Sequence, residues 1–82
     1  MTEQELTNLG FAKVNVSEEE SGSNAYYYFD LNLTHYTSLI SNSNDEALKN
    51  KWQVELFLDD SIVFTDIKDL QLFIDIIRRN IK

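Results

Sequence analysis

Residues 25–33, with the sequence AYYYFDLNL, decide the fold because aromatic and aliphatic side chains recur at every second position. This alternation, rich in aromatic residues, is typical of a β-strand with two distinct faces. One face carries Tyr27, Phe29, Leu31 and Leu33. The other carries Tyr26, Tyr28, Asp30 and Asn32. The apolar residues of the first face are predicted to be buried in the core, whereas the second face is more polar.

Shorter alternating segments surround this strand and predict an antiparallel sheet. We expect further strands at residues 11–16, 38–41, 51–58 and 62–64. Residues 17–24 are predicted as a polar hairpin loop, and residues 42–50 as a polar connection with a helical turn at 45–48. Asp59, Asp60 and Ser61 are predicted as a tight turn. Because all these connections are short, neighbouring strands are expected to pair antiparallel.

Helices are predicted at both ends of the chain. Near the N-terminus, residues 2–10 form a short helix in which Thr2 and Glu5 have the spacing of a capping box and Gly10 ends the helix. At the other end, Thr65 is expected to cap a long helix from Asp66 to about residue 81. Its apolar residues recur at spacings of three and four: Ile67, Leu70, Phe73, Ile74, Ile76, Ile77 and Ile81. The fold class is therefore α+β, in the order α-β-β-β-β-β-α, with the long helix on one face of the sheet and residues 1–82 as one domain.

Composition excludes several classes of function. The 82 residues include 14 acids and 7 bases, for a net charge of −7, and no cysteine. The charge argues against direct binding of nucleic acid or of an anionic membrane, and the lack of cysteine excludes thiolate chemistry. The N-terminus is acidic and no apolar run is long enough to span a bilayer, so we expect a cytoplasmic protein.

No motif in the sequence indicates catalysis, a metal or a cofactor. His35 is the single histidine and is interpreted as a surface loop residue. The acidic groups Glu18 to Glu20 and Asp59 to Asp60 lack the ligand spacing of a calcium loop, and neither glycine opens a phosphate-binding loop. The sequence therefore predicts a protein that is not an enzyme.

The feature that the fold leaves unexplained is the second face of the sheet. Tyr26, Tyr28 and Phe57 are predicted to lie there, and Phe11 is a candidate fourth member. Such an aromatic patch is either an interaction surface or the bed for the N-terminal helix, with Leu6 covering it. Aromatic rings on a sheet can also stack on bases, but acidic side chains share this face and argue against nucleic acid.

Charge and aromatic residues together predict a binding surface for a basic protein. The candidate binding residues are Tyr26, Tyr28, Asp30, Phe57, Glu18, Glu19 and Glu20. In composition alone, the chain resembles toxin immunity proteins and phage anti-defence inhibitors such as anti-CRISPRs, which implies an inhibitor of a basic nucleic-acid-handling protein. Two alternatives stay open: a self-associating structural domain, and an accessory domain that binds a small ligand near Tyr26, Tyr28 and His35.

Overall fold

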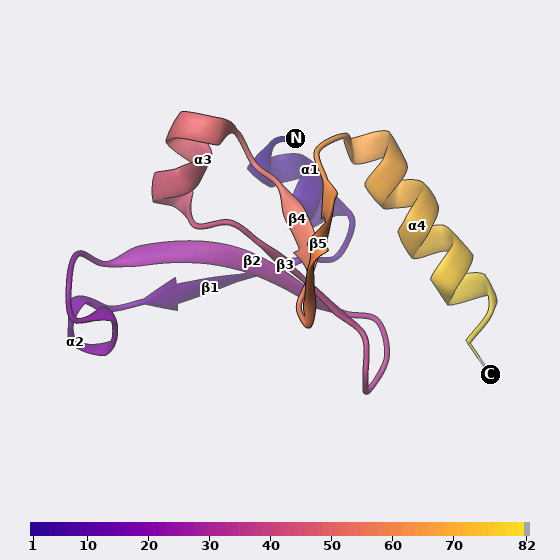
Figure 1. The fold of residues 1–82 in the computed structure, drawn as a ribbon, viewed down its shortest axis with the longest axis horizontal. Coiled ribbons are helices and arrows are strands. Elements are labelled where there is room, and N and C mark those ends of the chain that lie inside the picture. The colour runs from indigo at the N-terminus through magenta and orange to yellow at the C-terminus, as the bar shows by residue number, and fades with distance from the viewer. Residues whose placement is uncertain (82) are drawn as a thin grey trace.

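The computed structural model describes residues 1–81 and has the expected α+β architecture (Figure 1). The chain begins with α1 (Glu3–Asn8), β1 (Ala12–Val16), α2 (Glu18–Ser21), β2 (Tyr26–Asn32) and β3 (Ser38–Ser41). It continues with α3 (Asn44–Asn50), β4 (Val54–Leu56), β5 (Asp59–Phe64) and α4 (Ile67–Arg79). No helix among the described residues is both long and apolar enough to cross a membrane.

The five strands form an antiparallel meander in the order β1-β2-β3-β4-β5, as the short connections predict. Residues opposite each other share a face of the sheet, so the register assigns every strand residue to one side. On one side, Leu31, Leu39 and Leu56 form a row across β2, β3 and β4. On the other side, Asp30, Ile40 and Glu55 form the parallel row.

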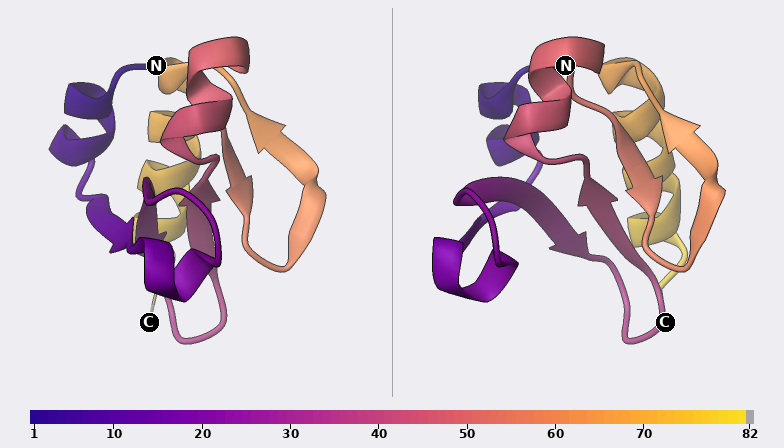
Figure 2. Two further views of the ribbon diagram at one scale, coloured as in Figure 1. Left: turned by 90° about the vertical axis from the view of Figure 1, so that its left-hand side faces the viewer. Right: turned by 60° about the vertical axis from the view of Figure 1, so that its left-hand side comes forward.

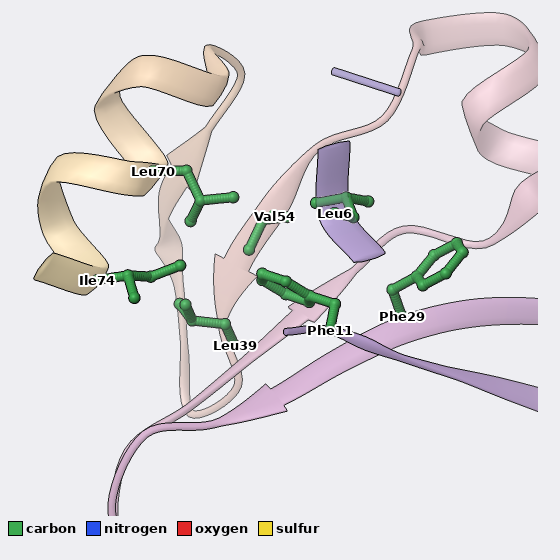
Figure 3. Packing of buried hydrophobic residues seen from close by; sticks show 7 residues of the cluster. All are labelled: Leu6, Phe11, Phe29, Leu39, Val54, Leu70 and Ile74. Carbon is green, nitrogen blue, oxygen red and sulfur yellow. The ribbon is translucent and has the colours of Figure 1, made fainter. Parts of the chain in front are cut away.

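Both α1 and α4 pack against the face that carries Leu39, which is called here the helix-bearing face. Leu6 of α1 joins Leu70 and Ile74 of α4 in one fully buried cluster (Figure 3). The right-hand view of Figure 2 shows α4 behind β4 and next to β5. The complete buried cluster contains Leu6, Phe11, Phe29, Leu39, Val54, Leu70 and Ile74. Of the two alternatives that the sequence left open for the opposite face, covering by α1 is therefore not the one that the structure has.

Phe11 is likewise not a member of the opposite face, because only 4% of its surface is exposed. It precedes β1, where Gly10 takes a backbone φ of 105° that side chains other than glycine rarely adopt. The Phe11 amide donates to the Leu6 carbonyl at 3.1 Å. Phe11 lies on the same side of β1 as Lys13, which pairs with the buried Phe29, so its ring follows the alternation of the strand into the core; the prediction assigned this side of β1 to the wrong face of the sheet.

Helix caps explain where the helices begin. In α1 the Thr2 hydroxyl accepts from the Glu5 amide, and the Glu5 carboxylate accepts from the Thr2 amide, which confirms the capping box. The cap of α4 is Asp66, whose carboxylate accepts from the Lys68 amide at 2.8 Å. Thr65 was expected in this role. The structure moves the cap by one residue, and aspartate fills it equally well.

Two predicted loops contain regular structure. Residues 17–24 include α2, capped by Ser17, and the turn expected at Asp59 to Ser61 is instead part of β5. The turn falls before Asp59, and the Asp59 carboxylate accepts from both the amide and the hydroxyl of Ser61. These hydrogen bonds hold the pKa of Asp59 below its ordinary value. An edge strand with exposed carboxylates is compatible with the sheet, because charges there discourage pairing with other chains.

β2 separates from β3 along half of its length. Backbone pairing between them covers only Asp30 to Asn32, whereas β1 pairs with β2 as far as Tyr26. Where the β3 backbone no longer pairs with β2, side chains accept the hydrogen bonds of the β2 amides. The Phe29 amide donates to the buried hydroxyl of Ser41, and the Tyr27 amide donates to the Asn44 side chain, each at 2.8 Å. The β1–β2 ribbon thus extends beyond the rest of the sheet, with α2 at its tip (Figure 1).

Candidate functional site

The candidate site is the sheet surface opposite α1 and α4, called here the outer face. Every residue that the register puts on it keeps a partly or fully exposed side chain, in contrast to the fully buried residues of the helix-bearing face. The outer face consists of Ala12, Val14, Val16, Tyr26, Tyr28, Asp30, Asn32, Ser38, Ile40, Glu55 and Val63, with Phe57 following at the end of β4.

A shallow hollow gathers the predicted binding residues at the centre of this face. Tyr28, Asp30, Ile40 and Phe57 line it, together with Asn32, Ser38 and Leu39, and its volume is about 270 Å³. The Phe57 amide donates to the Ser38 carbonyl at 3.0 Å, which fixes the end of β4 beside β3. The Phe57 side chain is 59% exposed. This outer hollow therefore combines two aromatic rings, an aliphatic side chain and one carboxylate.

Tyr26 continues the aromatic surface along the β1–β2 ribbon. Its ring centroid lies 6.5 Å from that of Tyr28, a normal spacing for a contacting aromatic pair. Val14 and Val16 lie opposite these two tyrosines in the register. The structure thus brings Tyr26, Tyr28, Asp30 and Phe57 onto one surface, as their alternation in the sequence predicts.

The three glutamates lie apart from the outer hollow, in α2 at the tip of the ribbon. Glu18, Glu19 and Glu20 form the first turn of that helix, and the Ser17 hydroxyl accepts from the Glu20 amide at 3.3 Å. Acidic side chains stabilise the first turn of a helix through the helix dipole, which gives these residues a local structural role. They extend the acidic surface beyond Tyr26 without adding to the hollow.

The charged residues on the outer face are all acidic. Asp30 of β2 and Glu55 of β4 both lie opposite Ile40 of β3, one on each side of it. None of the lysines and arginines among residues 1–81 occupies a strand position on the outer face: Lys13 is on the other side of β1, and the rest lie outside the strands, namely Lys49, Lys51, Lys68, Arg78 and Arg79. Lys13 points to the helix-bearing side, where its ammonium lies 4.0 Å from the centre of the Tyr27 ring.

His35 lies in the loop between β2 and β3, as expected for a surface residue. It lines a separate hollow with Asn32, Thr34 and Ser38, next to the outer hollow but without Tyr26 or Tyr28. The adjacent Tyr36 is 92% exposed. Among the described residues, no group of histidine and carboxylate side chains is arranged to hold a metal ion.

Sequence reasoning missed Ile40 and Val63 as members of the outer face. Both lie in short strands, where a run of three or four residues carries too little alternation to identify a face. Their place becomes evident only from the register, in which Ile40 lies opposite Asp30 and Val63 lies opposite Glu55.

Comparison of this chain with protein-family models, with curated proteins and with solved structures finds no match. Function must therefore be inferred from the geometry and charge of the chain itself.

Proposed function

We propose that this protein is a binding module that recognises a basic protein through its outer face. The observation that carries the proposal is the outer hollow, which Tyr28, Phe57 and Asp30 line together. Aromatic side chains are favoured at the centres of protein interfaces, and a carboxylate between rings suits the side chain of an arginine or a lysine. The hollow therefore supports a basic partner residue as its occupant.

Charge also favours a different protein over a second copy of the chain. In a symmetric dimer through the outer face, the same patch contacts itself, so that Asp30 and Glu55 would approach their own copies. Like charges across an interface oppose association, whereas a basic surface meets them favourably and associates faster. Self-association through the outer face is accordingly the second candidate.

We propose inhibition of a nucleic-acid-handling protein as the mode of action. Proteins that bind nucleic acid expose basic grooves with which they neutralise phosphates. A small domain with an acidic, aromatic face can occupy such a groove and exclude the nucleic acid. The net charge of −7 supports this reading. Because such partners act inside the cell, the cytoplasm is the compartment that we propose.

The direct test is capture from a lysate of the source organism on the immobilised chain, with elution in steps of rising salt. We expect a basic protein to be released at elevated salt, and the double variant Tyr28→Ala, Phe57→Ala to lose it. Leu72→Ala, Ile76→Ala is the matched control, because these α4 side chains are 57% and 41% exposed and lie away from the outer face. A partner that both variants retain equally would contradict the assignment of the outer face.

The captured protein then allows inhibition to be measured. Its binding to nucleic acid should decline as the chain is added, and the Tyr28→Ala, Phe57→Ala variant should leave that binding intact. Light scattering of the chain alone tests the second candidate: a dimer that Tyr28→Asp dissociates, with no captured partner, would favour self-association.

A further inference from the structure

A second hollow, of about 210 Å³, lies on the other side of the molecule between α1, α3 and the segment before β4. It is called here the Tyr27–Trp52 hollow. Glu3, Tyr27, Leu48 and Trp52 line it, together with Asn44 and Ala47. Tyr27 belongs to the helix-bearing face, so this site is separate from the outer face and from the function proposed above.

Hydrogen bonds and ring contacts hold the aromatic walls of this hollow in place. The Tyr27 hydroxyl donates to the Glu3 carboxylate at 2.9 Å, and the Tyr27 amide donates to the Asn44 side chain at 2.8 Å. Trp52 packs edge-on against Phe29, with ring centroids 5.4 Å apart. A site whose walls are already fixed loses less conformational entropy when a ligand binds.

The walls combine the groups that recognise organic cations. The Tyr27 and Trp52 ring centroids lie 6.2 Å apart with an inclination of 34°, and Glu3 lines the hollow beside them. Electron-rich ring faces attract cations, and tryptophan does so most strongly. The Tyr27 ring already has a cation on it, the ammonium of Lys13 at 4.0 Å, although Lys13 does not line the hollow.

We propose that the Tyr27–Trp52 hollow binds a methylated ammonium group. The apolar side chains of Ala47 and Leu48 complete the lining, and methyl groups can contact them where a strongly hydrated primary ammonium would lose its water. Leu48 is 86% exposed, which is unusual for a leucine and leaves its side chain available to such a ligand. The volume suits a head group rather than a larger molecule.

The fluorescence of Trp52 provides a direct readout, because it is the single tryptophan of the chain. We would titrate the protein with choline at constant ionic strength. The control ligand is 3,3-dimethylbutan-1-ol, which has the same shape without the charge. Choline should saturate the signal with a dissociation constant on the order of millimolar, and the alcohol should bind at least about five-fold more weakly. Equal responses to the two ligands, or no saturation by choline, would overturn the proposal.

Variants assign the site within the fold. Glu3→Gln should weaken choline binding about three-fold, the size expected for one exposed charge, whereas Glu46→Gln in α3 should leave it unchanged. Leu48→Ala should also weaken choline binding. Because the Leu48 side chain is exposed, the variant should fold normally, and circular dichroism checks this. Lys13→Gln removes the resident ammonium, so choline should bind more tightly. Tighter binding by Glu3→Gln would contradict the role of the carboxylate.

The same head group occurs in free metabolites and on trimethylated lysine side chains. A short peptide with one trimethyllysine, compared with its unmodified form, distinguishes these sources. If the trimethylated peptide binds at least ten-fold more tightly than choline, the ligand is a modified protein. If it binds no better than choline, the ligand is a free quaternary ammonium compound. Either result requires that choline itself binds, so the proposal stands or falls on the first titration.

Discussion

The hydroxyl of Tyr27 in β2 donates a hydrogen bond of 2.9 Å to the carboxylate of Glu3 in α1. This contact joins two elements that are 24 residues apart in the sequence. It holds α1 on the helix-bearing face, where Leu6 fills the core. The N-terminal helix therefore does not cover the outer face.

The first prediction concerns alkaline pH. The hydrogen bond to Glu3, partial burial and the negative charge of Glu3 together raise the pKa of Tyr27 above its ordinary value of 10.0. The folded protein therefore holds this proton more tightly than the unfolded chain does. The contribution of the Tyr27 hydroxyl to the free energy of unfolding is therefore fully present below pH 10 and is lost as the pH rises through the pKa of Tyr27 in the folded protein. Urea unfolding at stepped alkaline pH should show the decline, and Tyr27→Phe should reduce it.

Tyr36→Phe is the matched control for that experiment, because Tyr36 is 92% exposed. It should leave the pH dependence of stability unchanged. An equal reduction in both variants would mean that general alkaline unfolding, and not the Tyr27–Glu3 contact, causes the decline.

A second prediction separates two phenylalanines that the sequence pattern put on the same face. Phe11 is buried, so Phe11→Ala should lower the free energy of unfolding by about 3–5 kcal/mol. Phe57 is 59% exposed, so Phe57→Ala should change it by no more than about 0.5 kcal/mol. Urea denaturation of the two variants measures both values. Similar losses would contradict the placement of Phe11 in the core.

The third prediction tests the side chains that replace backbone pairing between β2 and β3. The Ser41 hydroxyl accepts from the Phe29 amide and donates to the Asn42 carbonyl, both at 2.8 Å, and Ser41 is buried. Ser41→Ala leaves the Phe29 amide without this partner and should cost about 1–3 kcal/mol. Hydrogen exchange at Phe29 should accelerate more than at other β2 amides. Ser38→Ala, in the same strand but partly exposed, should have a smaller effect on both measurements.

The fourth prediction locates the beginning of α4. Asp66→Ala removes the acceptor for the Lys68 amide and should cost about 1 kcal/mol of stability. Thr65→Ala should cost no more than about 0.5 kcal/mol, because Thr65 precedes the cap. Thermal unfolding followed by circular dichroism compares the two. A larger loss for Thr65→Ala would return the cap to the position that the sequence first indicated.

Periodicity predicted the long elements of this fold well. The alternation around Tyr28 and the spacing of Leu70 and Ile74 in α4 are both strong enough to identify a strand and a helix with their buried sides. Thr2 and Glu5 form the capping box that their spacing indicates. In each case local preference and tertiary packing favour the same structure.

Short-range patterns failed where tertiary contacts decide the conformation. Phe11 continues the alternation of β1 on the side of Lys13, but only the pairing of Lys13 with the buried Phe29 shows that this side is the helix-bearing one. Asp59 and Ser61 are residue types that favour a turn, yet both lie in β5, and Asp59 pairs with Leu56 of β4. The sequence placed α4 on the helix-bearing face but left the position of α1 open, because the residues of a short helix do not indicate which face of a sheet it packs against.

The separation of β2 from β3 determines the shape of the surface to which we propose that a basic protein binds. The β1–β2 ribbon crosses the direction of β4 and β5, so Tyr26 and Val63 stand on parts of the outer face that are inclined to each other (Figure 1). Such a surface is bent, and a flat partner can contact only one of its two halves at a time. A partner that contacts the whole outer face must therefore have a curved surface. Surface shape can thus select one basic protein among several that have a similar charge.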